Sequence, residues 1–166
     1  PLQMCNIICT IANRGYYYTP HVIRKIGTNN PLEKWSIKNF TLVTNKSCYE
    51  DVIDGMARAV TEGTSRVAII PGIEVCAKTG TAENPHGEDH SVFVCFAPRT
   101  NPKICIAVLV ENAGFGAAWA APIASLMMEK YLTGQIKRPE LEKRMFDGDL
   151  ISRGPGVSDK KPPRRR

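Results

Sequence analysis

The feature that most constrains the fold is a series of three apolar segments, at residues 73–82, 90–98 and 103–111, joined by short polar connectors. β-branched and aromatic residues are frequent in these segments, as is typical of strands. Connectors this short cannot carry a crossover, so consecutive segments must pair antiparallel. The sequence therefore predicts an antiparallel three-stranded meander. Its third segment is apolar on one face and nearly so on the other, which indicates that both faces of the sheet are covered.

Helical patterns lie on both sides of this meander along the chain. The first is expected at residues 2–14, the second from a capping box formed by Ser47 and Glu50 to about residue 62, and the third at about residues 117–133. The side chains expected to be buried are Leu2, Met4, Ile7, Ile8 and Ile11 in the first helix and Val52, Met56 and Val60 in the second. The fold class predicted is α+β, with helices packed on the meander.

The segment between the first two helices carries a weaker signal. Residues 16–18 are three tyrosines and are interpreted as a non-helical exit from the first helix. Residues 21–26 are expected to be extended, residues 27–31 to form a turn, and residues 40–43 to form a short strand.

Length and composition fit one globular unit. The 166 residues are 43% apolar, enough for a core, and no apolar run approaches the ~20 residues that span a bilayer. The chain begins with Pro, which favours the first turn of a helix. We therefore interpret it as a fragment whose first residue falls at a helix boundary.

The positive charge is concentrated at the C-terminal end. Residues 135–166 hold ten Lys/Arg against five Asp/Glu, whereas the preceding residues hold twelve against eleven. This composition predicts a domain over residues 1–134 and a basic, disordered tail over residues 135–166. Because the body is nearly neutral, it argues against a nucleic-acid-binding fold.

The six cysteines do not form a disulfide or metal pattern. No Cys-x-x-Cys pair occurs, and Cys5 and Cys9 lie one helical turn apart on the first predicted helix. A zinc site would also need His21, His86 or His90 at coordinating geometry, and no spacing indicates one. We expect buried free thiols and no metal.

The first strand carries an unusual series of side chains. Lys78, Thr79, Gly80 and Thr81 place a cation, a hydroxyl, a bare glycine and a second hydroxyl in succession. Glycine weakens a strand, and it usually marks either a bulge or a ligand that approaches the backbone closely. Strand alternation sends Thr79 and Thr81 to one face and Lys78 and Gly80 to the other. An ammonium, two hydroxyls and edge amides suit an anionic substrate and a developing oxyanion.

This stretch belongs to an ordered set of motifs. The set consists of residues 1–4 (PLQM), 78–83 (KTGTAE), 90–98 (HSVFVCFAP), 108–112 (VLVEN) and 120–122 (AAP). It resembles the end of the transpeptidase domain of class B penicillin-binding proteins, in the branch that serves cell elongation. The resemblance covers roughly residues 1–134 and implies a partial serine β-lactamase/transpeptidase-like fold. These enzymes are penicilloyl serine transferases with the motifs Ser-x-x-Lys, Ser-x-Asn and Lys-Thr-Gly.

The resemblance also implies a function for the intact parent protein. It would be a peptidoglycan D,D-transpeptidase that cross-links stem peptides through an acyl-serine intermediate, binds β-lactams and needs no cofactor. Its partners would be membrane proteins of the elongation machinery, and its location the periplasmic face of the inner membrane.

The resemblance implies a role for each residue of the motif. Lys78 would set the positive field and hold the Ser-x-Asn hydroxyl. Thr79 and Thr81 would bind the substrate carboxylate, and the Thr81 N–H would be one of two oxyanion donors. Gly80 would let the acyl group lie against the strand. The catalytic candidates are thus Lys78 and Thr81, and the substrate-binding candidates are all four residues.

The other two motifs of the family are not found in a usable position. The one Ser-x-x-Lys, Ser158 to Lys161, falls after Lys-Thr-Gly, which reverses the order of the family, and no Ser-x-Asn occurs. The neighbours Asp89, His90 and Ser91 superficially resemble a triad, but adjacent strand residues point to opposite faces. We therefore expect this chain to supply one wall of a site and to be inactive by itself.

Other functions fit parts of this pattern. A serine β-lactamase or β-lactam sensor shares the strand motif, and a non-catalytic interaction domain could carry it by chance. Nucleic-acid binding through residues 135–166 is a further alternative. In the resembled fold the sheet has five strands, and the partner of the third segment precedes this chain. Its free edge would favour a homo-oligomer through residues 103–111, unless the first helix or residues 21–45 cover it.

Overall fold

A single sheet organises the protein. The computed structural model describes residues 1–23, 25–28 and 33–150. Strands β3 (Cys76–Ala82), β4 (His90–Ala97) and β5 (Ile104–Val110) pair antiparallel in the order β3-β4-β5. The predicted meander is confirmed, and its register is continuous from the pair Cys76–Phe96 to the pair Ala82–His90.

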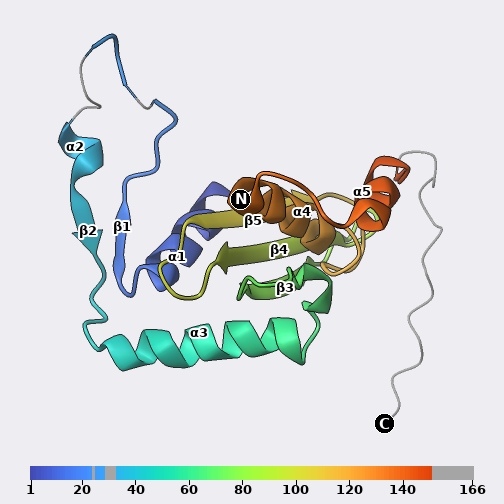
Figure 1. Ribbon diagram of the computed structural model, residues 1–166, viewed down its shortest axis with the longest axis horizontal. Helices are drawn as coiled ribbons and strands as arrows, with labels where there is room; N and C mark the ends of the chain where they lie inside the picture. Colours follow the sequence, from blue (N-terminus) through green and yellow to red (C-terminus); the bar gives the residue numbers. More distant parts are fainter. Residues whose placement is uncertain (24, 29–32, 151–166) are drawn as a thin grey trace.

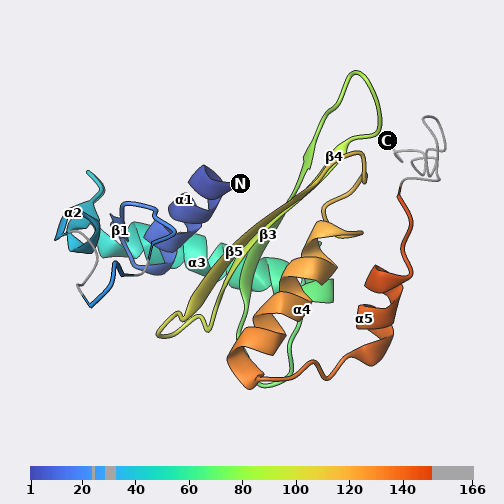
Figure 2. The same ribbon diagram turned by 90° about the horizontal axis from the view of Figure 1, so that it is seen from above.

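Helices cover both faces of this sheet (Figure 2). Helix α4 (Ala120–Thr133) packs on one face, and α1 (Leu2–Ala12) and α3 (Lys46–Thr61) pack on the other. A short 3-10 helix, Arg66–Ala68, contributes to the α4 side. The expectation that both faces are covered, and with it the α+β class, is therefore confirmed.

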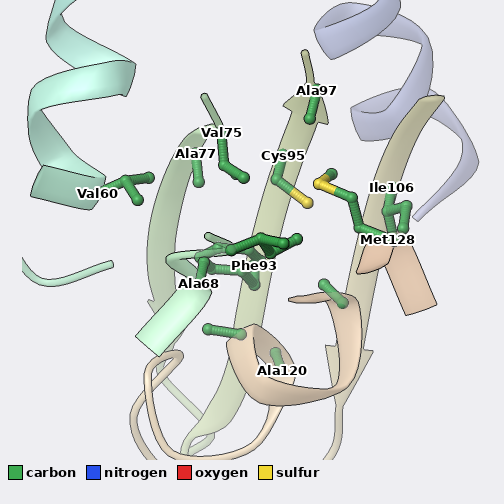
Figure 3. Packing of buried hydrophobic residues seen from close by; sticks show 13 residues of the cluster. Val60, Ala68, Val75, Ala77, Phe93, Cys95, Ala97, Ile106, Ala120 and Met128 are labelled. Atoms are coloured by element: carbon green, nitrogen blue, oxygen red, sulfur yellow. The ribbon is translucent and has the colours of Figure 1, made fainter. Parts of the chain in front are cut away.

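Strand alternation divides the core into two clusters. On the α4 face, Ala77, Phe93 and Cys95 from the sheet meet Ala120 and Met128 (Figure 3). On the opposite face, Cys76, Val94 and Phe96 meet the buried stripes of α1 and α3. The alanines at the start of α4 are fully buried, since small side chains let the helix approach the sheet closely.

The expected buried face of the first helix is partly wrong. Helix α1 ends at Ala12 rather than at residue 14, and Ile8 and Ala12 are its buried residues. Leu2, Met4 and Ile7 are exposed. The helix is apolar on most of its surface, so periodicity could not indicate which stripe faces the sheet.

The cap of the second predicted helix also differs from the expectation. The side chain of Asn45 caps α3, accepting hydrogen bonds from the Ser47 N–H at 3.0 Å and from the Ser47 hydroxyl at 2.9 Å. Glu50 is not part of a capping box, because it pairs with Arg14 at 2.8 Å. Met56 and Val60 are buried as expected, whereas Val52 is exposed. The buried stripe also includes Tyr49, Ile53 and Ala57.

An arm extends from the body between α1 and α3 (Figure 1). Strand β1 (Tyr16–Tyr18) pairs antiparallel with β2 (Lys38–Phe40), and α2 (Glu33–Ser36) directly precedes β2 along the chain. The predicted strand at 40–43 is thus shifted to 38–40, and the tyrosines, which were expected to be non-helical, form a strand. The expected extended piece at 21–26 forms no strand in the part of it that is described. Of the turn expected at 27–31, residues 29–31 lie outside the described residues.

The C-terminal residues depart most from the sequence-based expectation. Residues 139–146 form α5 (Pro139–Phe146), with Pro in its first turn, two acidic residues near its start and two basic residues near its end. The disordered tail is therefore wrong for this stretch, and residues 151–166 lie outside the described residues. None of the described helices is both long and apolar enough to cross a membrane.

Candidate active-site strand

The Lys-Thr-Gly stretch lies on an edge strand of the sheet. β3 starts in the core with the buried Cys76 and Ala77 and then emerges, so that Lys78 and Thr81 are exposed. Among the described residues no strand pairs with its outer side. Its regular pairing with β4 contains no bulge, so Gly80 does not mark one. An edge strand that emerges from the core can present both side chains and main-chain groups to a ligand.

Two hydrogen bonds hold the polar side chains of this strand. The Lys78 ammonium donates to the carbonyl of Thr79 at 2.7 Å. The hydroxyl of Thr79 lies 2.8 Å from the hydroxyl of Thr64, which follows α3. Sequence reasoning missed Thr64, and no local pattern could have found it, because the contact joins residues 15 positions apart. The contact fixes the direction of the Thr79 hydroxyl.

The connection from β5 to α4 approaches this strand at the backbone. A Cβ at position 116 would lie 2.5 Å from the carbonyl oxygen of Gly80 and closer still to that of Val92. Only glycine fits at Gly116, because a methyl group there would overlap main-chain atoms of two strands. A Cβ at Gly80 would lie 3.3 Å from the Val92 Cβ, so that position is also tight. The main chain of Gly80 is thus approached closely by a segment of this same chain, the connection from β5 to α4.

A buried serine anchors the same connection. The Ser91 hydroxyl donates to the carbonyl of Phe115 at 2.9 Å and accepts from the N–H of Ala120 at 3.1 Å. Ser91 pairs with Thr81 across the strands. The structure therefore fixes the start of α4 to the strand next to β3.

The rejection of an Asp89-His90-Ser91 triad is supported by these contacts. The His90 ring nitrogen Nδ1 accepts the N–H of Asn112 at 3.0 Å, and the carboxylate of Asp89 accepts the N–H of Asn84 at 3.4 Å. The hydroxyl of Ser91 is occupied by the connection to α4. Each side chain therefore has its own structural partner.

The arrangement offers a cation and two hydroxyls on an open strand, and it suits binding of an anionic group. The Ser158 to Lys161 motif lies outside the described residues. Within the described part of the chain, no group of three or more His, Cys, Asp or Glu side chains could hold a metal ion.

The six cysteines are free thiols, but only some are buried. Cys76 and Cys95 are buried, and burial raises the pKa of Cys76 to about 12. Cys48 is exposed, which contradicts the expectation for that residue. Cys5, Cys9 and Cys105 are half-buried.

Lys-Thr-Gly is a motif of penicillin-binding proteins and serine β-lactamases, and in this chain it lies on an edge strand of a three-stranded sheet between helical layers. The family model "Penicillin binding protein transpeptidase domain" matches residues 1–129. The chain belongs to the penicillin-binding protein transpeptidase family.

Sequence relatives agree with this assignment. The peptidoglycan D,D-transpeptidase PbpA of Mycobacterium tuberculosis is 33% identical, over 81% of this chain and 30% of its own length. The peptidoglycan D,D-transpeptidase MrdA of Haemophilus influenzae is 31% identical, over 86% of this chain and 25% of its own length. The chain thus spans about a third or less of these relatives.

Solved structures agree as well. Pseudomonas aeruginosa PBP2 in complex with WCK 5153 has a TM-score of 0.71 at 30% identity, covering 84% of this chain and 31% of that one. The imipenem acyl-enzyme complex of M. tuberculosis penicillin-binding protein A has a TM-score of 0.66 at 30% identity, covering 80% of this chain and 31% of that one. The resemblance and the fold implied by the motifs are therefore confirmed.

Proposed function

We propose that this chain forms one wall of the active site of a peptidoglycan D,D-transpeptidase, with the nucleophilic serine and its base on another part of the parent protein. The observation that carries the proposal is the series Lys78 to Thr81 on an open edge strand, in a chain of this family. The acyl-serine chemistry is that of penicilloyl serine transferases.

Each residue of the strand takes a role that its chemistry allows. The ammonium of Lys78 supplies the positive field, and the hydroxyls of Thr79 and Thr81 bind the carboxylate of the substrate. Thr64 orients Thr79 through the 2.8 Å contact between their hydroxyls. The N–H of Thr81 acts as an oxyanion donor, and Gly80 lets the acyl group lie along the strand.

Substrates, partners and location follow from relatives. Penicillin-binding protein A of M. tuberculosis is known as an acyl-enzyme with ceftriaxone and with imipenem, which supports β-lactam binding by the parent of this chain. A similar structure belongs to a peptidoglycan synthase complex that coordinates polymerization and crosslinking. We infer that the parent acts on stem peptides at the periplasmic face of the inner membrane, beside membrane proteins of the elongation machinery.

The test uses the parent protein and a labelled penicillin. Lys78→Ala should slow acylation by roughly 10- to 1,000-fold, since two charges ~4 Å apart interact by about 4 kcal/mol at an effective dielectric near 20, and only part of that is lost at an exposed site. Thr81→Val should act in the same direction. Lys103→Ala is the matched control, because Lys103 is also exposed but lies at the far edge of the sheet.

The outcomes separate the alternatives. Acylation that is unchanged in Lys78→Ala contradicts the roles assigned to the strand. A parent that never binds penicillin favours a non-catalytic interaction domain, and rapid hydrolysis of the adduct favours a β-lactamase. The 166-residue chain by itself should show no covalent adduct by mass spectrometry. A stoichiometric adduct would place the nucleophile in this chain.

A further inference from the structure

Three of the six cysteines meet away from the Lys-Thr-Gly strand, where α1 packs on β5. Cys5 and Cys9 lie one turn apart on α1, and Cys105 lies on the face of β5 that α1 covers. The Cys5 thiol donates to the carbonyl of Cys105 at 3.7 Å. The Cys9 thiol contacts the thiols of both Cys105 and Cys5. Half-buried thiols that touch one another differ from the separate buried thiols of the core.

The contacts make Cys9 the nucleophile of the group. Hydrogen bonding from the Cys105 thiol, helped by Cys5, lowers the pKa of Cys9 to about 7 against the opposing effect of burial. The same hydrogen bond, together with burial, raises the pKa of Cys105, and burial raises that of Cys5. The thiolate is the reactive form of cysteine, so near neutral pH Cys9 is the one of the three that attacks first.

Geometry selects Cys105 as the partner of Cys9. Helix positions four residues apart hold their Cβ atoms about 5–6 Å apart, whereas a disulfide needs about 3.5–4.5 Å. A bond between Cys5 and Cys9 would therefore distort α1. Cys9 and Cys105 lie on facing elements and already contact each other, and the Cys5 thiol is directed at a main-chain carbonyl.

We propose that Cys9 and Cys105 form a redox-active thiol pair that reacts with a small disulfide oxidant and closes a disulfide between α1 and β5. The Cys9 thiolate attacks one sulfur of the oxidant, whose S–S bond breaks, and the departing thiolate takes up a proton. Cys105 then loses its proton and attacks the Cys9 sulfur of the mixed disulfide, which releases the second small thiol. Two protein thiols are oxidised, and one small disulfide is reduced to two thiols.

The test treats the full 166-residue chain with oxidised glutathione, quenches with acid, alkylates the remaining thiols and maps tryptic peptides. The expected product links peptide 1–14 to peptide 104–130. It should persist in Cys5→Ser and be absent in Cys9→Ser and Cys105→Ser. Cys48 is the matched control, since its exposed thiol has no cysteine partner in these contacts and should stop at the mixed disulfide.

Rates and denaturation give a readout that does not depend on the variants. Although half-buried, Cys9 should react at least about fivefold faster than the exposed Cys48 at neutral pH, because thiolate fraction outweighs the lower nucleophilicity of an acidic thiol. Concentrated guanidinium should abolish this preference. A bridge between Cys5 and Cys9, a stable glutathione adduct on Cys9, or equal reactivity of all cysteines in the native chain would each overturn the proposal.

Discussion

Arg138 offers the sharpest test of how the C-terminal residues are held. Its guanidinium donates to the carboxylate of Glu129 at 3.0 Å, to the carbonyls of Val67 and Ile69 at 3.2 Å each, and to the carbonyl of Ser125 at 3.1 Å. The Glu129 side chain is 1% exposed and that of Arg138 is 19% exposed. The pair is therefore shielded from solvent on both sides.

Arg138→Met should lower the free energy of unfolding by about 3–5 kcal/mol, because it leaves the Glu129 carboxylate buried without its partner. The substitution also removes three hydrogen bonds to carbonyls, worth about 1 kcal/mol each, and the hydrogen bond to the Glu129 carboxylate, which is worth somewhat more. Their sum is a similar figure. The assay is urea denaturation followed by circular dichroism. The slope of the unfolding free energy against urea concentration should equal that of the unsubstituted chain, since a different slope would report a changed denatured or native state.

A second substitution isolates the charge. Glu129→Gln added to Arg138→Met should recover roughly 1–2 kcal/mol, because a neutral amide costs less to bury than an unpaired carboxylate. Arg58→Met is the control, since Arg58 pairs with Glu62 on an exposed helix face and should change stability by less than about 0.5 kcal/mol. A loss below about 1 kcal/mol in Arg138→Met, or no recovery in the double variant, would refute the reasoning.

Three further predictions concern the sheet. Gly116→Ala should destabilise the chain by roughly 1–3 kcal/mol, because the added methyl group would overlap main-chain atoms of Gly80 and Val92. The control Gly55→Ala, in α3 with open space around it, should stabilise the chain by about 0.5–1 kcal/mol. Similar urea midpoints for the two variants would contradict the close approach at Gly116. Thr64→Val should slow acylation of the parent by roughly 2- to 10-fold with little effect on folding, because the Thr79 hydroxyl loses one hydrogen bond. An unchanged acylation rate would show that Thr64 does not orient Thr79. The edge of β5 should pair with a second copy at high concentration, and a sedimenting monomer whose 104–110 amides exchange quickly would exclude this.

Local sequence signals predicted the strands of the sheet but not the long-range side-chain contacts that hold the surrounding elements. The strands were found because their alternation and short polar connectors are properties of neighbouring residues. Strand β3 was singled out as a candidate site because Lys78 to Thr81 are unusual in a strand, and the ordered motifs then identified the family. Arg138 was missed because its partners lie up to 71 positions away along the chain. The polar composition of residues 135–166 predicted a tail and gave no sign of the buried ion pair between Arg138 and Glu129.

Competition between local patterns explains the other differences. Ser47 and Glu50 form a sound capping box by sequence, but Arg14 binds Glu50 from 36 positions away and Asn45 caps the helix instead. The apolar surface of α1 gave no preferred stripe until β5 was in place. Thr64 belonged to no motif, because its role exists only through Thr79.

Gly116 brings the segment that leads into α4 against β3, the strand that carries Lys-Thr-Gly. Main-chain atoms of Gly116 lie against those of Gly80, and four residues later the N–H of Ala120 is held by Ser91. Because the first contact is with β3 and the second with β4, we expect the start of α4 to move together with these two strands. A displacement of about 1 Å at a reacting group can cost a hundredfold in rate. The positional accuracy of the Lys-Thr-Gly strand is therefore set in part by a helix that carries none of the motif.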